Sequence, residues 1–145
     1  ESVGGSRACE LNTGYSGKPL ASKMGIKSGQ RIIILNAPDG YKTTLGALPD
    51  GVEVVHDLAG QFDLIQYFTT ERAAYERDFP ILRDALLTAG MLWVSWPKKA
   101  AKMATDLDEN VIRDIGLANG LVDVKVIAVD ERWSGLKFVR RVKDR

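Results

Sequence analysis

The chain has 145 residues, of which 45% are hydrophobic and 27% are charged, and its formal net charge at pH 7 is +1. This length suits one domain, and the balanced charge argues against a field that would draw the protein to nucleic acid or to an anionic membrane. Cys9 is the only cysteine, which excludes an intrachain disulfide and cysteine-based zinc clusters. No stretch approaches the ~20 apolar residues of a membrane-spanning helix, so we expect a cytoplasmic protein without a membrane partner.

The chain divides into two predicted regions. Residues 1–17 are expected to form a flexible segment, and residues 18–145 a single α/β domain. A short helix is predicted over Lys18–Met24, because Ser16 is suited to cap it, Pro19 falls in its first turn and Gly25 follows its end.

Continuous apolar runs predict strands that are buried on both faces. The first is Arg31–Asn36, where Ile32–Leu35 is bounded by Gly29 and by turn-forming residues. Trp93 and Trp96 lie three positions apart on a later strand and should therefore face opposite sides of the sheet. The other predicted strands are Val52–His56, Phe62–Phe68, Met91–Trp96, Leu121–Val129 and Leu136–Val142. The last two have so short a link that they should form an antiparallel hairpin.

Helical periodicity predicts helices over Tyr41–Leu48, Glu71–Leu87 and Asp108–Ala118. In the second of these, Thr69 and Thr70 offer caps at the start, Ala89-Gly90 ends the segment, and Tyr75, Phe79, Leu82 and Leu86 share one apolar face. Pro80 should kink that helix or divide it in two, with Asp78 capping the second half. The alternation of strands and helices predicts a three-layer, Rossmann-like, mostly parallel sheet that ends in an antiparallel carboxy-terminal hairpin.

Three segments resemble S-adenosylmethionine-dependent methyltransferases. Phe62–Ile65 resembles the start of that family's fourth strand, Leu82–Val94 resembles its turn into the fifth strand, and the terminal hairpin resembles its last two strands. The resemblance implies a methyltransferase-like fold. One β-α unit of that fold is missing between Val52–His56 and Phe62–Phe68.

The loop after the first strand departs from that family. The family's loop is glycine-rich, so that the backbone can approach the cofactor closely. Here Asn36–Gly40 has one glycine, and Pro38 has no N–H to donate. We therefore expect no cofactor, with S-adenosylmethionine kept as the alternative.

Four further segments resemble a bacterial family of unknown function over nearly the whole chain. They are Gly14–Ala21, Lys23–Ile26, Asn36–Tyr41 and Trp93–Lys99. This resemblance implies no activity.

Open α/β sheets bind ligands beyond the carboxyl ends of their strands, where the strand order reverses. Gly40 opens a helix there, and two lysines add positive charge, so we predict a small anionic ligand. The candidate ligand-binding residues are Asn36, Asp39, Gly40, Tyr41, Thr69, Trp96, Lys98 and Lys99, with Thr70 on the same rim. The alternative is that these residues cap turns and pack against helices.

The sequence assigns neither a catalytic residue nor a metal site. His56 is the only histidine, which excludes a metal site built on several histidines. The resemblance implies that Asp57 stands near the position where methyltransferases hold the cofactor ribose, although a solvated turn carboxylate is the other interpretation.

Three functions stay open at this point. The first is a non-catalytic or repurposed methyltransferase-like module that binds a small anionic ligand or a protein partner. The second is an enzyme that uses S-adenosylmethionine or a nucleotide through its altered glycine loop. The third is an adaptor that contacts nucleic acid through the basic tail Arg132–Arg145, although such runs are more typical of solvated edge strands. The terminal hairpin would also allow a homodimer.

Overall fold

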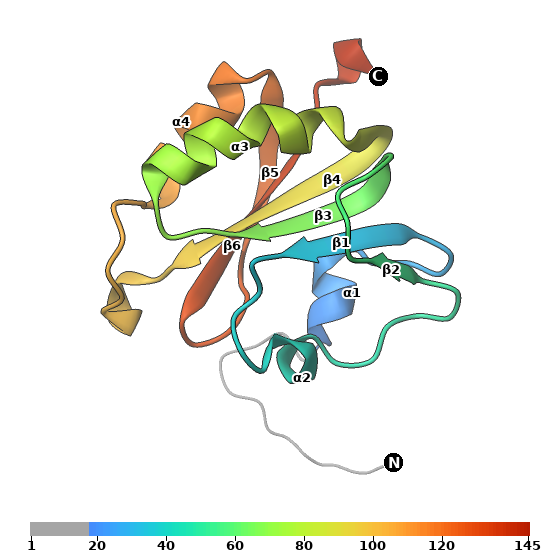
Figure 1. Cartoon of the computed structure of the whole chain (residues 1–145), viewed down its shortest axis with the longest axis horizontal. Coiled ribbons are helices and arrows are strands. Elements are labelled where there is room, and N and C mark those ends of the chain that lie inside the picture. Colours follow the sequence, from blue (N-terminus) through green and yellow to red (C-terminus); the bar gives the residue numbers. More distant parts are fainter. Residues whose placement is uncertain (1–17) are drawn as a thin grey trace.

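The computed structural model describes residues 18–145, so the predicted amino-terminal segment and the Ser16 cap lie outside the described residues. One sheet of six strands runs through the described part, in the order β2-β1-β3-β4-β6-β5 (Figure 1). The strands are β1 (Arg31–Leu35), β2 (Glu53–Val55), β3 (Phe62–Phe68), β4 (Leu86–Pro97), β5 (Leu121–Ala128) and β6 (Trp133–Arg140). The first four are parallel, and β6 is antiparallel to both β4 and β5. This confirms the predicted fold class.

Helices cover both faces of the sheet. On one face lie α1 (Leu20–Met24) and α2 (Tyr41–Leu45), and on the other lie α3 (Arg72–Asp84) and α4 (Glu109–Ala118) (Figure 1). Two short 3-10 turns, Lys99–Ala101 and Val142–Asp144, complete the elements. The helix α4 begins one residue later than predicted, and Asp108 caps it, since its side chain accepts a hydrogen bond from the Val111 amide at 2.9 Å.

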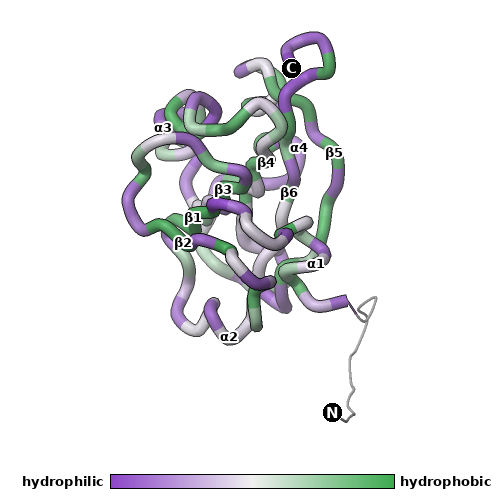
Figure 2. Tube along the Cα trace, turned by 90° about the vertical axis from the view of Figure 1, so that its right-hand side faces the viewer, coloured by the Kyte–Doolittle hydropathy of each residue, from purple (hydrophilic) through white to green (hydrophobic). Residues whose placement is uncertain are grey.

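Two hydrophobic clusters fill the space between the sheet and the helices. In β1, Ile32 packs in the α1-side cluster and Ile33 in the α3-side cluster, and both are fully buried. Trp93 and Trp96 divide in the same way, as predicted, and the Trp93 indole N–H donates to the Met24 carbonyl at 2.9 Å. Figure 2 shows the hydrophobic central strands with hydrophilic loops around them. The sheet is therefore a middle layer with a core on each side.

The predicted division of α3 at Pro80 is wrong. It is a single helix with Pro80 inside it, and Asp78 bonds to Tyr67 and Arg77 instead of capping a second helix. Proline removes the donor to the carbonyl four residues earlier, which belongs to Glu76. Because Glu76 is exposed, water can hydrate that carbonyl, and the helix continues.

The strand β4 corrects another prediction, since it begins at Leu86 and not at Met91. Residues 89 and 90 therefore belong to the strand and do not end the helix. The register against β3 shifts here, because Phe62 pairs with Leu86 but Leu64 pairs with Met91. A side chain at Gly90 would place its Cβ 2.8 Å from the Phe62 carbonyl oxygen, so this close approach requires glycine.

The terminal hairpin is tighter than predicted. The strand β6 begins at Trp133, three residues before the expected start, and only residues 129–132 link it to β5. Asn119-Gly120 ends α4 after Ala118, with Gly120 at a φ of 89°.

A loop stands in place of the missing β-α unit. Residues 56–61 pass from β2 to β3 without a helix, and Arg31 holds them. Its guanidinium donates to the Ala59 carbonyl at 2.9 Å and to the Gln61 carbonyl at 2.7 Å. The loop gives less cover than a helix would, and Leu58 is still 36% exposed.

Candidate functional site

The carboxyl ends of β1 and β3 form the switch point of the sheet. These strands are parallel neighbours as far as the pair Leu35 and Tyr67. After β1 the chain turns to α2 on one face, and after β3 it turns to α3 on the other. The two connections leave in opposite directions, which is the geometry that opens a crevice in α/β sheets.

A cavity of about 300 Å³ opens at this point. Aromatic rings form its apolar wall, polar side chains form its rim, and four parts of the chain contribute. It is lined by Asn36, Tyr67, Phe68, Thr69, Thr70, Glu71, Ala74, Arg77, Asp78 and Trp133. A second cavity of about 240 Å³ shares Asn36, Tyr67 and Asp78 with the first, and Leu35, Leu58, Ile81 and Leu82 complete it. The first lies at the lower end of the volumes typical of small-molecule pockets, roughly 300–1,000 Å³.

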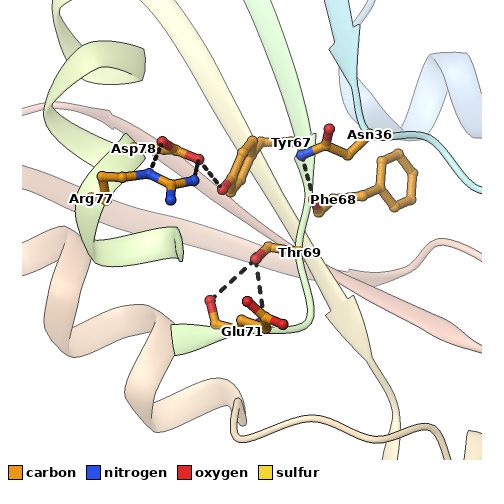
Figure 3. A network of polar contacts seen from close by, with 7 residues as sticks. All are labelled: Asn36, Tyr67, Phe68, Thr69, Glu71, Arg77 and Asp78. Carbon is orange, nitrogen blue, oxygen red and sulfur yellow. Dashed lines mark hydrogen bonds and ion pairs between the residues drawn. The ribbon is translucent and has the colours of Figure 1, made fainter. Parts of the chain in front are cut away.

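Asn36 fixes the turn at the end of β1. Its φ of 59° lies in the left-handed region, which asparagine tolerates better than most residues with a side chain. Its side-chain amide donates to the Phe68 carbonyl at 3.3 Å (Figure 3). The side chain therefore ties the end of β1 to the end of β3.

Tyr67, Arg77 and Asp78 form a hydrogen-bonded trio (Figure 3), and Tyr67 and Asp78 line both cavities. The Tyr67 hydroxyl donates to one Asp78 oxygen at 2.7 Å, and the Arg77 guanidinium donates to both Asp78 oxygens at 3.0 and 3.2 Å. The bonds from Arg77 lower the pKa of Asp78, whereas burial and then Asp78 raise the pKa of Tyr67. Near neutral pH, Asp78 is therefore ionised and Tyr67 keeps its proton, so neither group exchanges a proton readily.

The amino terminus of α3 is closed from within the chain. The Arg72 amide donates to an Asp106 carboxylate oxygen at 2.7 Å, so the cap comes from the loop before α4 and not from Thr69 or Thr70. The Thr69 hydroxyl instead bonds the Glu71 backbone (Figure 3). A carboxylate thus already occupies the positive end of this helix, where a bound anion would otherwise be favoured. A cavity of about 390 Å³ adjoins this cap, lined by Thr70, Glu71, Ala73, Ala104, Thr105 and Asp106.

The structure brings only part of the candidate set to the switch-point cavity. Asn36, Thr69 and the neighbouring Thr70 line it. Asp39 and Gly40 are exposed in the loop before α2, and Lys98 and Lys99 follow β4, with the Lys98 amide bonded to the Arg132 carbonyl. None of these four residues lines any of the three cavities described above.

Tyr41 and Trp96 belong to the hydrophobic core. Tyr41 is 4% exposed, and its hydroxyl donates to Gln66 Oε1 at 2.5 Å on the α1 side of the sheet. Trp96 is 5% exposed and packs in the α3-side cluster. Both side chains are therefore used in packing.

Several cavity residues are not among the ligand-binding candidates taken from the sequence. Tyr67 and Asp78 had a local signal, since Tyr67 is the penultimate residue of a strand and Asp78 stands beside the apolar face of the helix that follows. Trp133 had none, because it comes from the hairpin near the end of the chain and reaches the site only through the β4–β6 pairing.

The basic tail is largely engaged by its own neighbours. Arg140 donates to the Arg83 and Leu86 carbonyls, and Arg141 forms an ion pair with Asp144 at 3.1 Å.

In residues 18–145, no group of three or more histidine, cysteine or acidic side chains is placed to hold a metal ion. No helix in this part of the chain is long and apolar enough to cross a membrane.

No protein-family model matches the sequence, and no curated protein matches it. Solved structures match the fold. Magnesium protoporphyrin IX methyltransferase from Synechocystis PCC 6803, with bound SAH, has a TM-score of 0.57 at 15% identity and covers 84% of this chain and 78% of its own. The DhpI–SAH complex has a TM-score of 0.60 at 13% identity, covering 86% and 84%. The fold is methyltransferase-like.

A third match agrees with these two. The ribosomal protein L11 methylase from Lactobacillus delbrueckii subsp. bulgaricus has a TM-score of 0.56 at 15% identity, covering 84% of this chain and 75% of its own. Identities this low establish architecture alone.

The loop after β1 does not fit S-adenosylmethionine in the pose that a glycine-rich loop supports. Pro38 offers no N–H, and the helix that follows Gly40 has only five residues. Asp57, which the resemblance places near the position of the cofactor ribose, is exposed and lines neither switch-point cavity. The edge of the sheet beyond β2 also has no further strand in the described part of the chain. The residues at this end of the sheet therefore do not fit the cofactor in that pose.

Proposed function

We propose that this chain is a small-molecule-binding module of methyltransferase-like fold, and that its ligand occupies the cavity at the carboxyl ends of β1 and β3. The observation that carries the proposal is that cavity, about 300 Å³ in volume, at the switch point of the sheet. An apolar wall with a few converging polar groups is the usual composition of a ligand pocket.

The lining favours a ligand with a flat apolar body. Phe68 and Trp133 meet edge to face with their ring centroids 5.1 Å apart, and both are nearly fully buried. Their position is fixed by the core beneath them, so the wall is preorganised. Preorganised apolar surface reduces the entropy that binding costs.

The charges of the lining favour a cationic or hydrogen-bond-donating group on that ligand. Among residues 18–145, Arg77 is the only basic residue that lines the cavity, and Asp78 neutralises it. Glu71 adds a second carboxylate, and Asp106 already caps the adjacent helix. This argues against the small anion that Lys98 and Lys99 had suggested.

The lining also favours binding over acid-base catalysis. It contains no cysteine, histidine, lysine or serine. The pKa of Tyr67 is raised and that of Asp78 is lowered, which moves both away from the range in which a general acid or base works at neutral pH.

Two matched probes test the ligand chemistry. In an amide NMR titration of the full chain, benzamidinium should shift the resonances of Asn36, Thr69 and Glu71, whereas benzoate at the same concentration should not. The probes share a ring and differ in charge. Stronger shifts from benzoate, or shifts by both probes outside the cavity, would overturn the proposal.

A pair of variants locates the binding. Ala74→Phe should fill the cavity and abolish the benzamidinium shifts, because Ala74 lines it. Ala73→Phe is the matched control, since Ala73 lies next along α3 and lines only the cavity beside Asp106. Equal loss in both variants would place the probe elsewhere.

A second candidate is S-adenosylmethionine bound in another pose. The left-handed φ of Asn36 favours it, because this is a conformation that glycine adopts readily and the family's loop is glycine-rich, and similar structures were solved with SAM or SAH bound. Calorimetry with each compound tests this candidate. Micromolar binding that is lost in Gly40→Val but kept in Gly46→Val would support it over the module proposed above. The control is matched, since both glycines have a φ of 79° and open space around them.

A further inference from the structure

A row of lysines crosses the sheet face that carries α1. The middle of the row is a cross-strand pair, since Lys125 on β5 lies directly opposite Lys137 on β6. The residues on either side of Lys137, Leu136 and Phe138, pack in the α3-side cluster, so Lys137 itself projects from the α1 side. Five lysines make up the row, namely Lys98, Lys23, Lys125, Lys137 and Lys27.

The fold holds these lysines together through backbone contacts. The Lys125 ammonium donates to the Lys23 carbonyl, and the Lys23 ammonium donates to the Ala128 carbonyl, both at 3.4 Å. Lys98 lies at one end, where its amide donates to the Arg132 carbonyl at 2.8 Å. From Trp133, beside that end, to Lys137, β6 advances four residues, or about 13 Å at roughly 3.3 Å per residue.

The positive charges of neighbouring lysines in the row repel one another. Besides burial, the charges of Lys125 and Lys98 lower the pKa of Lys23, and those of Lys125 and Lys27 lower the pKa of Lys137. The strand pairing gives the arrangement its length, because Lys98 follows the residue that pairs with Trp133 at the start of β6, whereas the pair of Lys125 and Lys137 lies four residues further along that strand.

No acidic side chain compensates four of these lysines. Within residues 18–145, Lys27, Lys98, Lys125 and Lys137 form no ion pair. On the opposite face of the hairpin, by contrast, Asp123 pairs with Arg113 of α4 at 2.9 Å. Like charges directly opposite one another destabilise a sheet, so the lysine face has an electrostatic cost that a bound anion would relieve.

We propose that the lysine row binds the phosphodiester backbone of a nucleic acid. A line of ammonium groups matches the regular negative charges of an extended strand. None of the large exposed hydrophobic side chains in the described part of the chain is aromatic, so bases have no exposed ring on which to stack. Binding is therefore to the backbone and independent of base sequence.

This surface differs from the basic tail considered in the sequence analysis. The tail's Arg140 and Arg141 are engaged by carbonyl groups and by Asp144, whereas the outer lysines of the row are not engaged. The formal net charge of +1 describes the whole chain and does not oppose a local positive face. The inference is also independent of the ligand proposed for the cavity.

Fluorescence anisotropy of the full chain with a labelled oligothymidylate tests the proposal. The affinity should fall as salt rises, with a log–log slope of about −3 for four phosphate contacts at roughly −0.7 each. A labelled duplex should bind through the same lysines. Absence of salt-dependent binding to either probe would overturn the proposal, as would tighter binding of poly-glutamate, which would indicate an acidic protein partner.

Matched variants locate the surface. Lys125→Gln/Lys137→Gln should weaken oligothymidylate binding by about tenfold or more at low salt and reduce the slope by about 1.4, the contribution of two contacts. Lys143→Gln/Arg145→Gln removes the same charge from the tail and should leave both quantities nearly unchanged. Equal weakening by the two double variants would overturn the assignment. The row variant should melt no lower than the parent, because it removes a like-charge pair.

Discussion

At the residue scale, the trio of Tyr67, Arg77 and Asp78, which contributes to both cavities, depends on the Tyr67 hydroxyl group. Tyr67→Phe removes the bond to Asp78 and leaves an ionised carboxylate with Arg77 as its only side-chain partner. We expect a loss of about 1–2 kcal/mol in the free energy of unfolding, in the lower part of the range for bonds to charged groups. Urea denaturation measures it. Arg77→Gln is the control and should cost less than Tyr67→Phe, because the Arg77 side chain is 72% exposed. A larger loss for Arg77→Gln would contradict this view of the trio.

The same carboxylate predicts a dependence of stability on pH. The bonds from Arg77, and then the one from Tyr67, lower the pKa of Asp78 below its ordinary 3.8. The folded state therefore binds this proton less tightly than the unfolded state, and the stabilisation is present above pH 3.8 and lost as the pH falls through the lowered pKa. Asp78→Asn should accordingly be less stable than the parent near neutral pH, and the difference should shrink in acid. Urea denaturation of both proteins across this range measures the difference, and a constant gap would contradict the assignment.

At the element scale, one glycine sets the distance between α4 and the sheet. A Cβ at Gly116 would lie 2.1 Å from Cε1 of Phe138, a ring that is fully buried against Phe79. Alanine favours a helix over glycine by about 1 kcal/mol, whereas overpacking a core costs about 1–3 kcal/mol, and here the ring has little room to move. Gly116→Ala should therefore lower the melting temperature. Leu117→Ala, at a position that is 45% exposed, should change it little. An increase for Gly116→Ala would show that the helix can shift.

The sequence predicted the kinds of element better than their ends. The apolar run around Ile32–Leu35 and the stripe Tyr75, Phe79 and Leu82 predict burial, and these side chains are wholly or partly buried in the structure. The boundary between α3 and β4 depends on the contact of Gly90 with the Phe62 carbonyl and on the hydration of the Glu76 carbonyl beside Pro80. Both are tertiary conditions, and local propensity does not contain them.

In the candidate site, too, the residues fixed by local sequence were predictable and those fixed by tertiary contacts were not. Asn36 and Thr69 could be placed at the switch point because each directly follows a strand that the apolar pattern identifies. Trp133 and Asp106 reach the site through pairing and capping partners more than 30 residues away in the chain. Lys98 lies past the end of β4, yet it does not line the cavity, and its amide bonds the Arg132 carbonyl of the hairpin instead. The edge of the sheet was thus predictable, and the set of side chains along it was not.

At the scale of the whole molecule, the sheet couples two separate cores. Every described strand contributes to one sheet, and adjacent residues such as Ile32 and Ile33 pack on opposite sides of it, so neither core can form without the other. We therefore expect both cores to unfold together. The three tryptophans allow a direct measurement, because Trp93 and Trp133 report on the α1 side and Trp96 on the α3 side.

Two variants isolate the signals. Trp93→Phe/Trp133→Phe leaves Trp96 as the only tryptophan, and Trp96→Phe/Trp133→Phe leaves Trp93. In each variant, the urea midpoint from fluorescence should coincide with that from far-UV circular dichroism, as all-or-none unfolding requires. Comparing the two signals within one variant removes the effect of the substitutions on stability. A fluorescence midpoint below the circular dichroism midpoint for Trp93 alone would show that the face carrying α1 and the lysine row opens before the rest, and the single-domain prediction would fail.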